Sequence, residues 1–178
     1  MLYSMPINIS QWIEDHREQL KPPVCNKQVF EQDDFIVMIV GGPNNRSDYH
    51  YNETPELFYQ IEGDMILQVI EHDDNNQPIF KDITIKQGEL FLLPPKVLHS
   101  PQRFENTIGM VVEQKRGEQQ LDELHWYCRD CHALMYREAF ALANIETDLP
   151  KVFERFFTDH AQCKACGFSF EIPDKYKK

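Results

Sequence analysis

The hydrophobic positions along this chain change their spacing twice, and each spacing predicts a different kind of structure. Near the N-terminus, Trp12, Ile13 and Leu20 follow Ser10, and this pattern predicts a short amphipathic helix capped by the serine. Further along, short apolar or alternating runs are separated by closely spaced turn residues, with hardly any helical periodicity. Many short strands of this kind indicate a β-sandwich or a small barrel of the jelly-roll type. The predicted strands are 35–40, 49–51, 57–61, 65–70, 79–85, 90–93, 97–100 and 108–112.

Beyond the last predicted strand the pattern changes again. Residues 114–123 are polar and charged, which makes them a candidate linker. The run 135–142 fits a strand or a helix, because its periodicity does not decide between them. A helix capped by Thr147 or Asp148 follows, with Pro150 in its first turn. The apolar face of this helix would consist of Leu149, Val152, Phe153, Phe156 and Phe157.

Length and charge narrow the classes of protein to which the chain belongs. Its 178 residues suit one main domain, residues 1–117, with a small tail, residues 118–178. A formal charge of −11 disfavours nucleic acid and anionic membrane surfaces as partners. No apolar run approaches the roughly 20 residues of a membrane span, and the N-terminus lacks the pattern of a signal peptide. We therefore expect a cytoplasmic protein with neither nucleic acid nor membrane as a partner.

The tail contains two CxxC pairs, which predict a metal site. They are Cys128 with Cys131 and Cys163 with Cys166, and Cys25 is left over as a free thiol. Paired CxxC knuckles typically form a tetrahedral four-thiolate site, which selects zinc or iron. In a reducing compartment this interpretation is favoured over disulfides. We expect the site to staple a tail that is too small for a large core, rather than to transfer electrons.

Two further stretches, residues 42–63 and 88–103, look like hairpins that carry metal ligands. His50, Glu56 and His99 are the candidate ligands. Two histidines and one carboxylate suit Fe(II), and three protein ligands leave coordination positions open for a substrate and oxygen. A single histidine in a β-rich core is more often a hydrogen-bonded core residue than a metal ligand. The assignment as ligands therefore depends on the spacing of all three residues.

The spacing in the first stretch resembles the first cupin motif, which consists of a glycine, His-x-His, a glutamate and a second glycine. His50 takes the first histidine position, and Glu56 and Gly63 fit. Asn52 stands where the second histidine would be. The usual set of three histidines and one glutamate is thus reduced to two histidines and one glutamate.

The second stretch resembles the second cupin motif. Gly88, Pro94 and His99 fit its spacing. Lys96 replaces a glycine of the motif, and Arg103 replaces its asparagine. These departures from the general motif are informative, because they point to one family within the superfamily.

That family is 3-hydroxyanthranilate 3,4-dioxygenase, which longer stretches of the chain closely resemble. The stretches are 37–44, 46–50, 54–60, 92–103 and 111–114. The resemblance extends to the two CxxC pairs and so covers nearly the whole chain. It implies a mainly β fold, with a cupin-type jelly-roll barrel as the catalytic domain and a small rubredoxin-like four-Cys tail. It also suggests a homodimer.

The resemblance implies a reaction and two metal sites. Fe(2+) would be held by His50, Glu56 and His99, and a second Fe or Zn by the four cysteines. The enzyme would open the ring of 3-hydroxyanthranilate with O2 between C3 and C4, which gives 2-amino-3-carboxymuconate semialdehyde. That product cyclises to quinolinate, a precursor of NAD. The resemblance thus implies a reaction in tryptophan catabolism, in the kynurenine pathway.

The resemblance also implies which residues bind the substrate. Arg46 and Arg103 would bind its carboxylate, because a planar donor fork suits a planar anion. Glu113 would face the amino and hydroxyl groups, beside Glu56, and accept a proton. Asn26 would lie near the oxygen side of the pocket. Without the resemblance, the arginines would be read as surface residues, Glu113 as a solvent-side strand end and Asn26 as a turn former.

Two alternatives remain open at the level of the sequence. In the first, the cupin acts on another aminophenol or on a thiol, although two arginines favour an aromatic carboxylate. In the second, the chain is a non-catalytic cupin binding module whose tail is a zinc ribbon that contacts a partner. Iron dependence and oxygen uptake discriminate between them, since a binding module shows neither.

Overall fold

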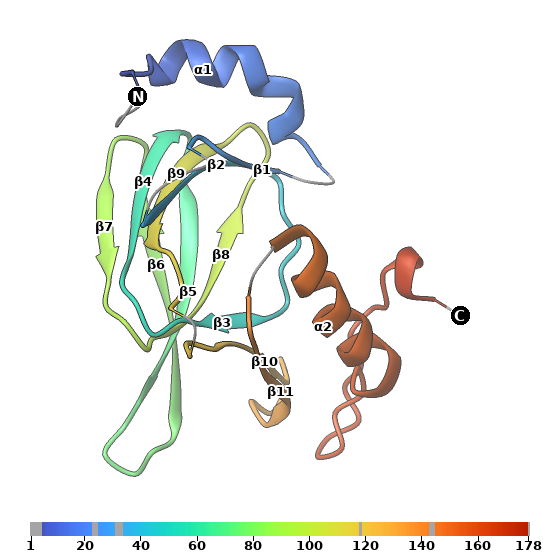
Figure 1. Ribbon diagram of the computed structural model, residues 1–178. Helices are drawn as coiled ribbons and strands as arrows, with labels where there is room; N and C mark the ends of the chain where they lie inside the picture. Colours follow the sequence, from blue (N-terminus) through green and yellow to red (C-terminus); the bar gives the residue numbers. More distant parts are fainter. Residues whose placement is uncertain (1–4, 23–24, 31–33, 118, 143–144, 178) are drawn as a thin grey trace.

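The computed structural model describes residues 5–22, 25–30, 34–117, 119–142 and 145–177, and these form two antiparallel sheets (Figure 1). The five-stranded sheet has the order β1 (Asn26–Gln28), β2 (Phe35–Gly41), β9 (Ile108–Gln114), β4 (Glu56–Glu62), β7 (Leu90–Leu93). The six-stranded sheet has the order β11 (Leu134–Phe140), β10 (Asp122–Tyr127), β3 (Tyr49–Tyr51), β8 (Leu98–Arg103), β5 (Met65–His72), β6 (Pro78–Ile85). The predicted mainly β, cupin-type fold is confirmed.

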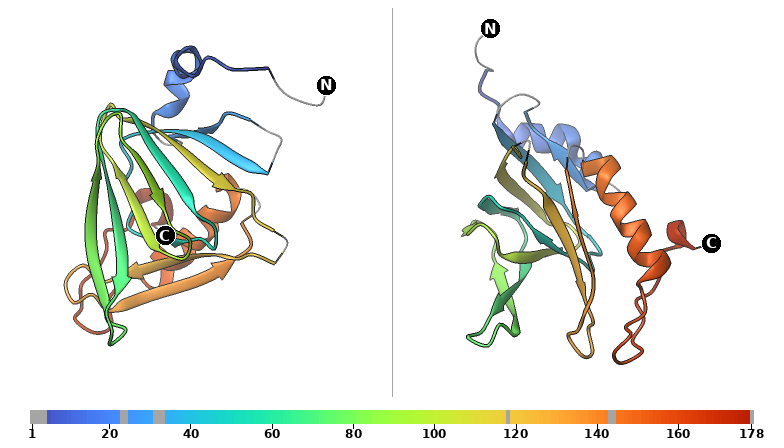
Figure 2. Two further views of the ribbon diagram at one scale, coloured as in Figure 1. Left: turned by 90° about the vertical axis from the view of Figure 1, so that its left-hand side faces the viewer. Right: turned by 60° about the horizontal axis from the view of Figure 1, so that its bottom comes forward.

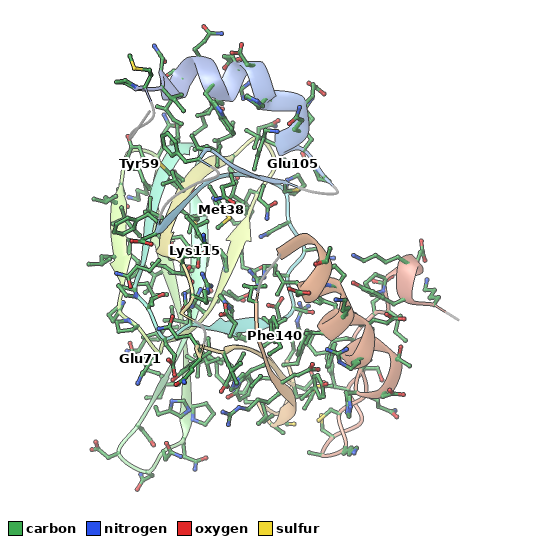
Figure 3. All side chains as sticks on the ribbon, viewed as in Figure 1. Met38, Tyr59, Glu71, Glu105, Lys115 and Phe140 are labelled. Atoms are coloured by element: carbon green, nitrogen blue, oxygen red, sulfur yellow. The ribbon has the colours of Figure 1, made fainter. Side chains whose placement is uncertain are left out.

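The main core lies between the two sheets. Alternating side chains of β4 and β5 are buried, as expected for strands with one face on a core. Partly buried Met38 of β2 packs against this core (Figure 3). The buried members come from both sheets, and they are Phe58, Met65, Leu67, Val69, Ile85, Leu93 and Val111.

All eight predicted strands are present, but two strands were not predicted. β1 is one of them, and β10 is the other. The polar stretch 114–123 is only partly a connection, because β9 runs to Gln114 and β10 begins at Asp122. The run 135–142 proves to be strand, since it forms most of β11. The boundary between residues 117 and 118 stays a prediction, because residue 118 lies outside the described residues.

The N-terminal helix covers one end of the five-stranded sheet (Figure 1). It consists of α1 (Ile9–His16) followed by the 3-10 turn η1 (Arg17–Leu20). The prediction that Ser10 caps it was wrong. Asn8 is the cap, and its side chain accepts a hydrogen bond of 3.1 Å from the backbone of Gln11. Asparagine caps as well as serine does, so a cap two residues earlier was equally available.

The C-terminal helix α2 (Ile145–Asp159) packs against β10, and a 3-10 turn, η2 (Asp174–Tyr176), follows near the end of the chain (Figure 2). Because the helix begins at Ile145, neither Thr147 nor Asp148 caps it, and Pro150 lies beyond its first turn. Packing rather than local capping decides where this helix runs. Its Phe156 ring stacks on Trp126 of β10 at 4.3 Å between centroids. Among the described residues, no helix is long and apolar enough to cross a membrane.

Candidate metal centre and active site

Three predicted ligands converge between the two sheets. His50 on β3 and His99 on β8 are directly paired in the six-stranded sheet. Glu56 begins β4 in the opposite sheet. All three are buried, and one ligand atom from each lies within 4.8 Å of the others. The two sheets thus bring residues far apart in the sequence to one point.

The orientation of the two imidazoles leaves one nitrogen of each facing Glu56. His50 Nδ1 lies 3.6 Å from Glu56 Oε1, and His99 Nε2 lies 3.3 Å from Glu56 Oε2. The other nitrogens are occupied: His50 Nε2 lies 2.6 Å from Asp122 Oδ2, and His99 Nδ1 lies 2.9 Å from the Val97 carbonyl oxygen. Histidines that bind metals typically engage their second nitrogen in this way. The donor set therefore fits a divalent metal ion.

The electrostatics of the three residues also favour a cation between them. Burial opposes ionisation of Glu56, but His99, His50 and Asn52 hold its pKa below the usual range. Burial lowers the pKa of His50. The pKa of His99 is raised despite its burial, because the Glu56 carboxylate stabilises positive charge next to it. The site thus combines a carboxylate with a neutral imidazole and stabilises added positive charge.

A second carboxyl group lies directly opposite the ligand carboxylate. Glu113 of β9 is the register partner of Glu56 and is buried, not on the solvent side. The Asn52 amide nitrogen lies 3.3 Å from Glu56 Oε1 and 3.4 Å from Glu113 Oε2, so it bridges the two. Burial and the charge of Glu56 raise the pKa of Glu113 to about 7, although Arg116 opposes this shift. Such a group can take up and release a proton near neutral pH.

The two predicted arginines have different partners. Arg103 is only 3% exposed, and it donates to Gln60 Oε1 at 3.0 Å. Burial and the charge of Arg46 lower its pKa to about 10. Arg46 is paired with the buried Asp48. Among the ion pairs of the described residues, none involves Arg103, which leaves a buried cation without an acidic partner.

Asn26 is the one predicted site residue whose side chain the structure does not connect to the others. It lies on β1, at the edge of the five-stranded sheet, where it pairs with Val40. No hydrogen bond joins its side chain to another predicted site residue among those described. Its predicted place near the pocket stays a prediction.

Four residues that contact the site were missed by sequence reasoning. Asn52 was read only as a lost ligand, and Gln60 carries no motif. Arg116 and Asp122 fall in the polar stretch 114–123, where charge suggested a linker. A signal for β10 was present, since apolar Leu124 and Trp126 alternate with the more polar Glu123, His125 and Tyr127.

Comparisons with known proteins place the chain in a family. A family model described as 3-hydroxyanthranilic acid dioxygenase matches residues 1–157. The chain belongs to the 3-hydroxyanthranilic acid dioxygenase family. A 3-hydroxyanthranilate 3,4-dioxygenase of Xanthomonas euvesicatoria pv. vesicatoria is 50% identical over 173 residues, which cover 96% of this chain and 95% of that one. One from Podospora anserina is 44% identical over 168 residues, with 93% and 89% covered.

Among solved structures, a cupin-2 domain containing protein from Shewanella frigidimarina aligns with a TM-score of 0.46. It is 21% identical and covers 61% of this chain and 94% of that one.

This member of the 3-hydroxyanthranilic acid dioxygenase family also contains a four-cysteine cluster in its tail. Cys128 Sγ lies 3.4 Å from Cys166 Sγ, and Cys131 Sγ lies 3.7 Å from Cys163 Sγ. All four sulfurs lie within 4.8 Å of one another, and no disulfide joins them. A tetrahedron of thiolates with metal bonds of about 2.3 Å has edges of about 3.8 Å. The cluster therefore fits a four-thiolate metal site. Gly167, at φ 84°, makes the tight turn that follows.

Proposed function

We propose that the protein is a non-haem Fe(II) dioxygenase that opens the ring of 3-hydroxyanthranilate with O2 to 2-amino-3-carboxymuconate semialdehyde. The observation that carries this is the convergence of buried His50, Glu56 and His99 in a member of this family. Relatives that match nearly the whole chain at about 50% identity are named 3-hydroxyanthranilate 3,4-dioxygenase. The product leads to quinolinate and so to NAD.

The three ligands would hold Fe(2+) through His50 Nδ1, His99 Nε2 and the Glu56 carboxylate. When bound, the metal would act as a Lewis acid on the substrate hydroxyl and bring the substrate and O2 together. The protein would contribute a water-poor, preorganised site, because all three side chains are buried and both histidines are fixed through their second nitrogens.

Arg103 and Arg46 would bind the substrate carboxylate. Arg103 is buried and has no acidic partner among the described residues, so an anion would compensate its charge. Gln60 fixes the position of one of its guanidinium nitrogens. Arg46 is held by Asp48, and the charges of Asp48 and Glu56 raise its pKa against the effect of burial, which supports a role next to the ligand carboxylate.

Glu113 would accept the proton that the substrate hydroxyl loses on binding. Its raised pKa, about 7, lets it hold that proton at neutral pH and return it later in the reaction. Asn52 would keep this acid–base group aligned with the ligand Glu56, because it reaches both carboxyl groups. We keep Asn26 as a further candidate on the oxygen side.

For the second site we propose iron or zinc, bound by the four cysteines as a structural centre. Four clustered cysteines without a disulfide favour a reducing compartment, so we propose that the protein is cytoplasmic. Metal analysis of a His99→Ala variant, which retains only the four-Cys site, would identify its metal.

We also propose a homodimer, formed through the outer face of the five-stranded sheet. Phe35, Leu90 and Leu92 on this face are 55%, 62% and 61% exposed. Register pairs place Leu92 opposite Leu57, and Leu57 opposite Val112, so the apolar row crosses the sheet. A row of this kind is best covered by an identical face. Light scattering should give twice the chain mass of 21.1 kDa, and the single mass would exclude the dimer.

Anaerobic reconstitution with Fe(II), followed by 3-hydroxyanthranilate in air, tests the reaction. The amount of O2 consumed should equal the amount of semialdehyde formed, which is measured by its near-UV absorbance. Both oxygen uptake and product formation should be lost in His99→Ala. No turnover with iron bound at both sites would reject this substrate. Tight substrate-analogue binding without oxygen uptake would instead support the non-catalytic binding module.

A further inference from the structure

A buried charged network lies on the outer side of the metal ligands, beyond the residues that the proposed reaction uses. The His50 imidazole, which offers Nδ1 to the metal centre, has its Nε2 2.6 Å from Asp122 Oδ2. Asp122 is fully buried at the start of β10. Arg116 donates to both oxygens of this aspartate, from Nε at 2.9 Å and from Nη2 at 2.7 Å. A two-point fork of this kind fixes the plane of the carboxylate.

The same guanidinium reaches the proposed acid–base group. Arg116 Nη1 lies 2.5 Å from Glu113 Oε2. The Arg116 side chain is 7% exposed, so this network is shielded from water. One arginine thus connects the outer partner of a metal ligand with the group that would accept the substrate proton.

The hydrogen bonds of this network determine which nitrogen of His50 is available. Both oxygens of Asp122 accept hydrogen bonds from the Arg116 guanidinium, an arrangement that fits an ionised carboxylate. A carboxylate only accepts hydrogen bonds, so the proton of a neutral His50 sits on Nε2. The lone pair then sits on Nδ1, the nitrogen that faces Glu56. Carboxylate partners of this kind orient a ligand and make it more basic.

We propose that Asp122 and Arg116 are positioning residues, which fix His50 with its lone pair toward the metal and hold Glu113 in the same network. This rests on the proposed function for the role of Glu113, but the part that concerns His50 requires only that the site binds a metal. Neither residue belongs to the candidate ligand group of His50, Glu56 and His99.

Backbone pairing shows why His50 needs such support. Its strand β3 has only three residues, and a single pair, His50 with His99, joins it to β8. On its other side it forms three pairs with β10. β10 also carries Asp122, so one strand fixes both the backbone and the ring of His50.

The test compares Asp122→Asn with Glu123→Gln, the same chemical change at the next residue. Glu123 binds His125 and Arg137 instead of the ligand histidine, which makes it a matched control. With the four-Cys site filled with zinc, the dissociation constant of Co(II) at the histidine site is measured by chelator competition. Asp122→Asn should weaken Co(II) binding about 10- to 100-fold. Glu123→Gln should leave it unchanged.

Arg116→Gln separates the two halves of the proposal. It should weaken metal binding less than Asp122→Asn does, since the aspartate still accepts from His50. It should lower kcat with little change in KM, because Glu113 loses its anchor while the carboxylate-binding arginines remain. If folded Arg116→Gln has the same metal affinity and the same kcat as the wild type, the proposed role of Arg116 is overturned.

A measurement on the unsubstituted protein covers the case in which the variants fail to fold. Nitrogen-15 NMR of labelled histidines should show neutral His50 protonated at Nε2. A proton at Nδ1, or wild-type Co(II) affinity in folded Asp122→Asn, would overturn the proposal. If wild type binds Co(II) tightly and Asp122→Asn does not, while Fe(II)-loaded wild type leaves 3-hydroxyanthranilate unchanged, only the proposed reaction fails.

Discussion

At the scale of single residues, the site is characterised by ionisable side chains that are buried. Glu56, Glu113 and Asp122 are buried carboxyl groups, yet their environments give them different pKa values. Histidines and a guanidinium keep two of them ionised, while the third is poised near neutral pH. Arg103 is the buried group whose charge the described residues do not neutralise. Two predictions follow from these differences.

Arg103→Ala should raise the KM for 3-hydroxyanthranilate by about 10- to 100-fold, because a charge-assisted hydrogen bond to a buried carboxylate contributes about 1.5–3 kcal/mol. The effect on kcat should be smaller, since the metal ligands are not disturbed. Steady-state kinetics measure both values. Arg137→Ala is the control, because this arginine is exposed and pairs with Glu123 away from the metal ligands. An unchanged KM in Arg103→Ala would show that the arginine does not bind the substrate.

Arg116→Gln should shift the acid limb of the pH–kcat profile to higher pH. The charged groups that act on Glu113 are Arg116, Glu56 on the neighbouring strand, and Asp122. The Arg116 cation lowers the pKa of Glu113, so its removal leaves burial and two carboxylates to raise that pKa further. The proton-accepting carboxylate then forms only at higher pH.

Arg116→Lys is the matched control for this shift, because it retains the charge. Its acid limb should stay closer to that of the wild type. A limb that moves to lower pH in Arg116→Gln would mean that a different group limits the reaction.

At the scale of elements, two directly opposed residue pairs build the centre. His50 faces His99 in one sheet, and Glu56 faces Glu113 in the other. The packing of the two sheets then sets the distance between the pairs. A residue that touches neither pair can therefore alter the site by displacing a side chain between the sheets, and Gly109 of β9 is such a residue.

Gly109→Ala should raise KM, because the added methyl group would displace Arg103. A Cβ at this position would lie less than 3.0 Å from both Gln60 Oε1 and Arg103 Nη1. Overpacking of this kind costs about 1–3 kcal/mol. Thermal unfolding and steady-state kinetics together measure the effect. Gly117→Ala, where only the Gln120 side chain approaches, should change neither. Wild-type KM in Gly109→Ala would show that Arg103 tolerates the displacement.

The sequence predicted the elements whose pattern is local and missed those that depend on tertiary contact. The eight apolar or alternating runs became strands, and most of them contribute side chains to the main core. Ligand spacing singled out His50, Glu56 and His99, and these three residues do converge. The prediction of two hairpins was wrong, because β3 and β4 lie in different sheets, as do β7 and β8. Asp122 and Arg116 were missed, because charged residues in a polar stretch look solvated until a partner such as His50 is seen.

At the scale of the whole molecule, one strand connects the two metal centres. β10 begins with Asp122, next to His50, and ends one residue before Cys128 of the four-cysteine cluster. Between them, Trp126 packs on α2 and joins the tail to the sheet. The tail has an aromatic core of its own, and a metal bound by the cluster would add to its stability. The backbone of β10 thus links the two candidate metal sites.

Cys128→Ser should therefore lower stability far more than it lowers kcat. Loss of one thiolate releases the tail metal, and a loss of about 3 kcal/mol lowers the Tm by roughly 6–12 °C in a chain of this size. Fe(II) affinity at the histidine site should fall slightly, because β10 loses its anchor at one end. Calorimetry, metal analysis and kinetics on Fe(II)-saturated protein measure the three effects. Cys25→Ser, the same change at a buried thiol outside the cluster, should retain both metals and show a smaller fall in Tm. If Cys128→Ser instead keeps normal stability but loses turnover, the cluster takes part in the reaction and its role is not purely structural.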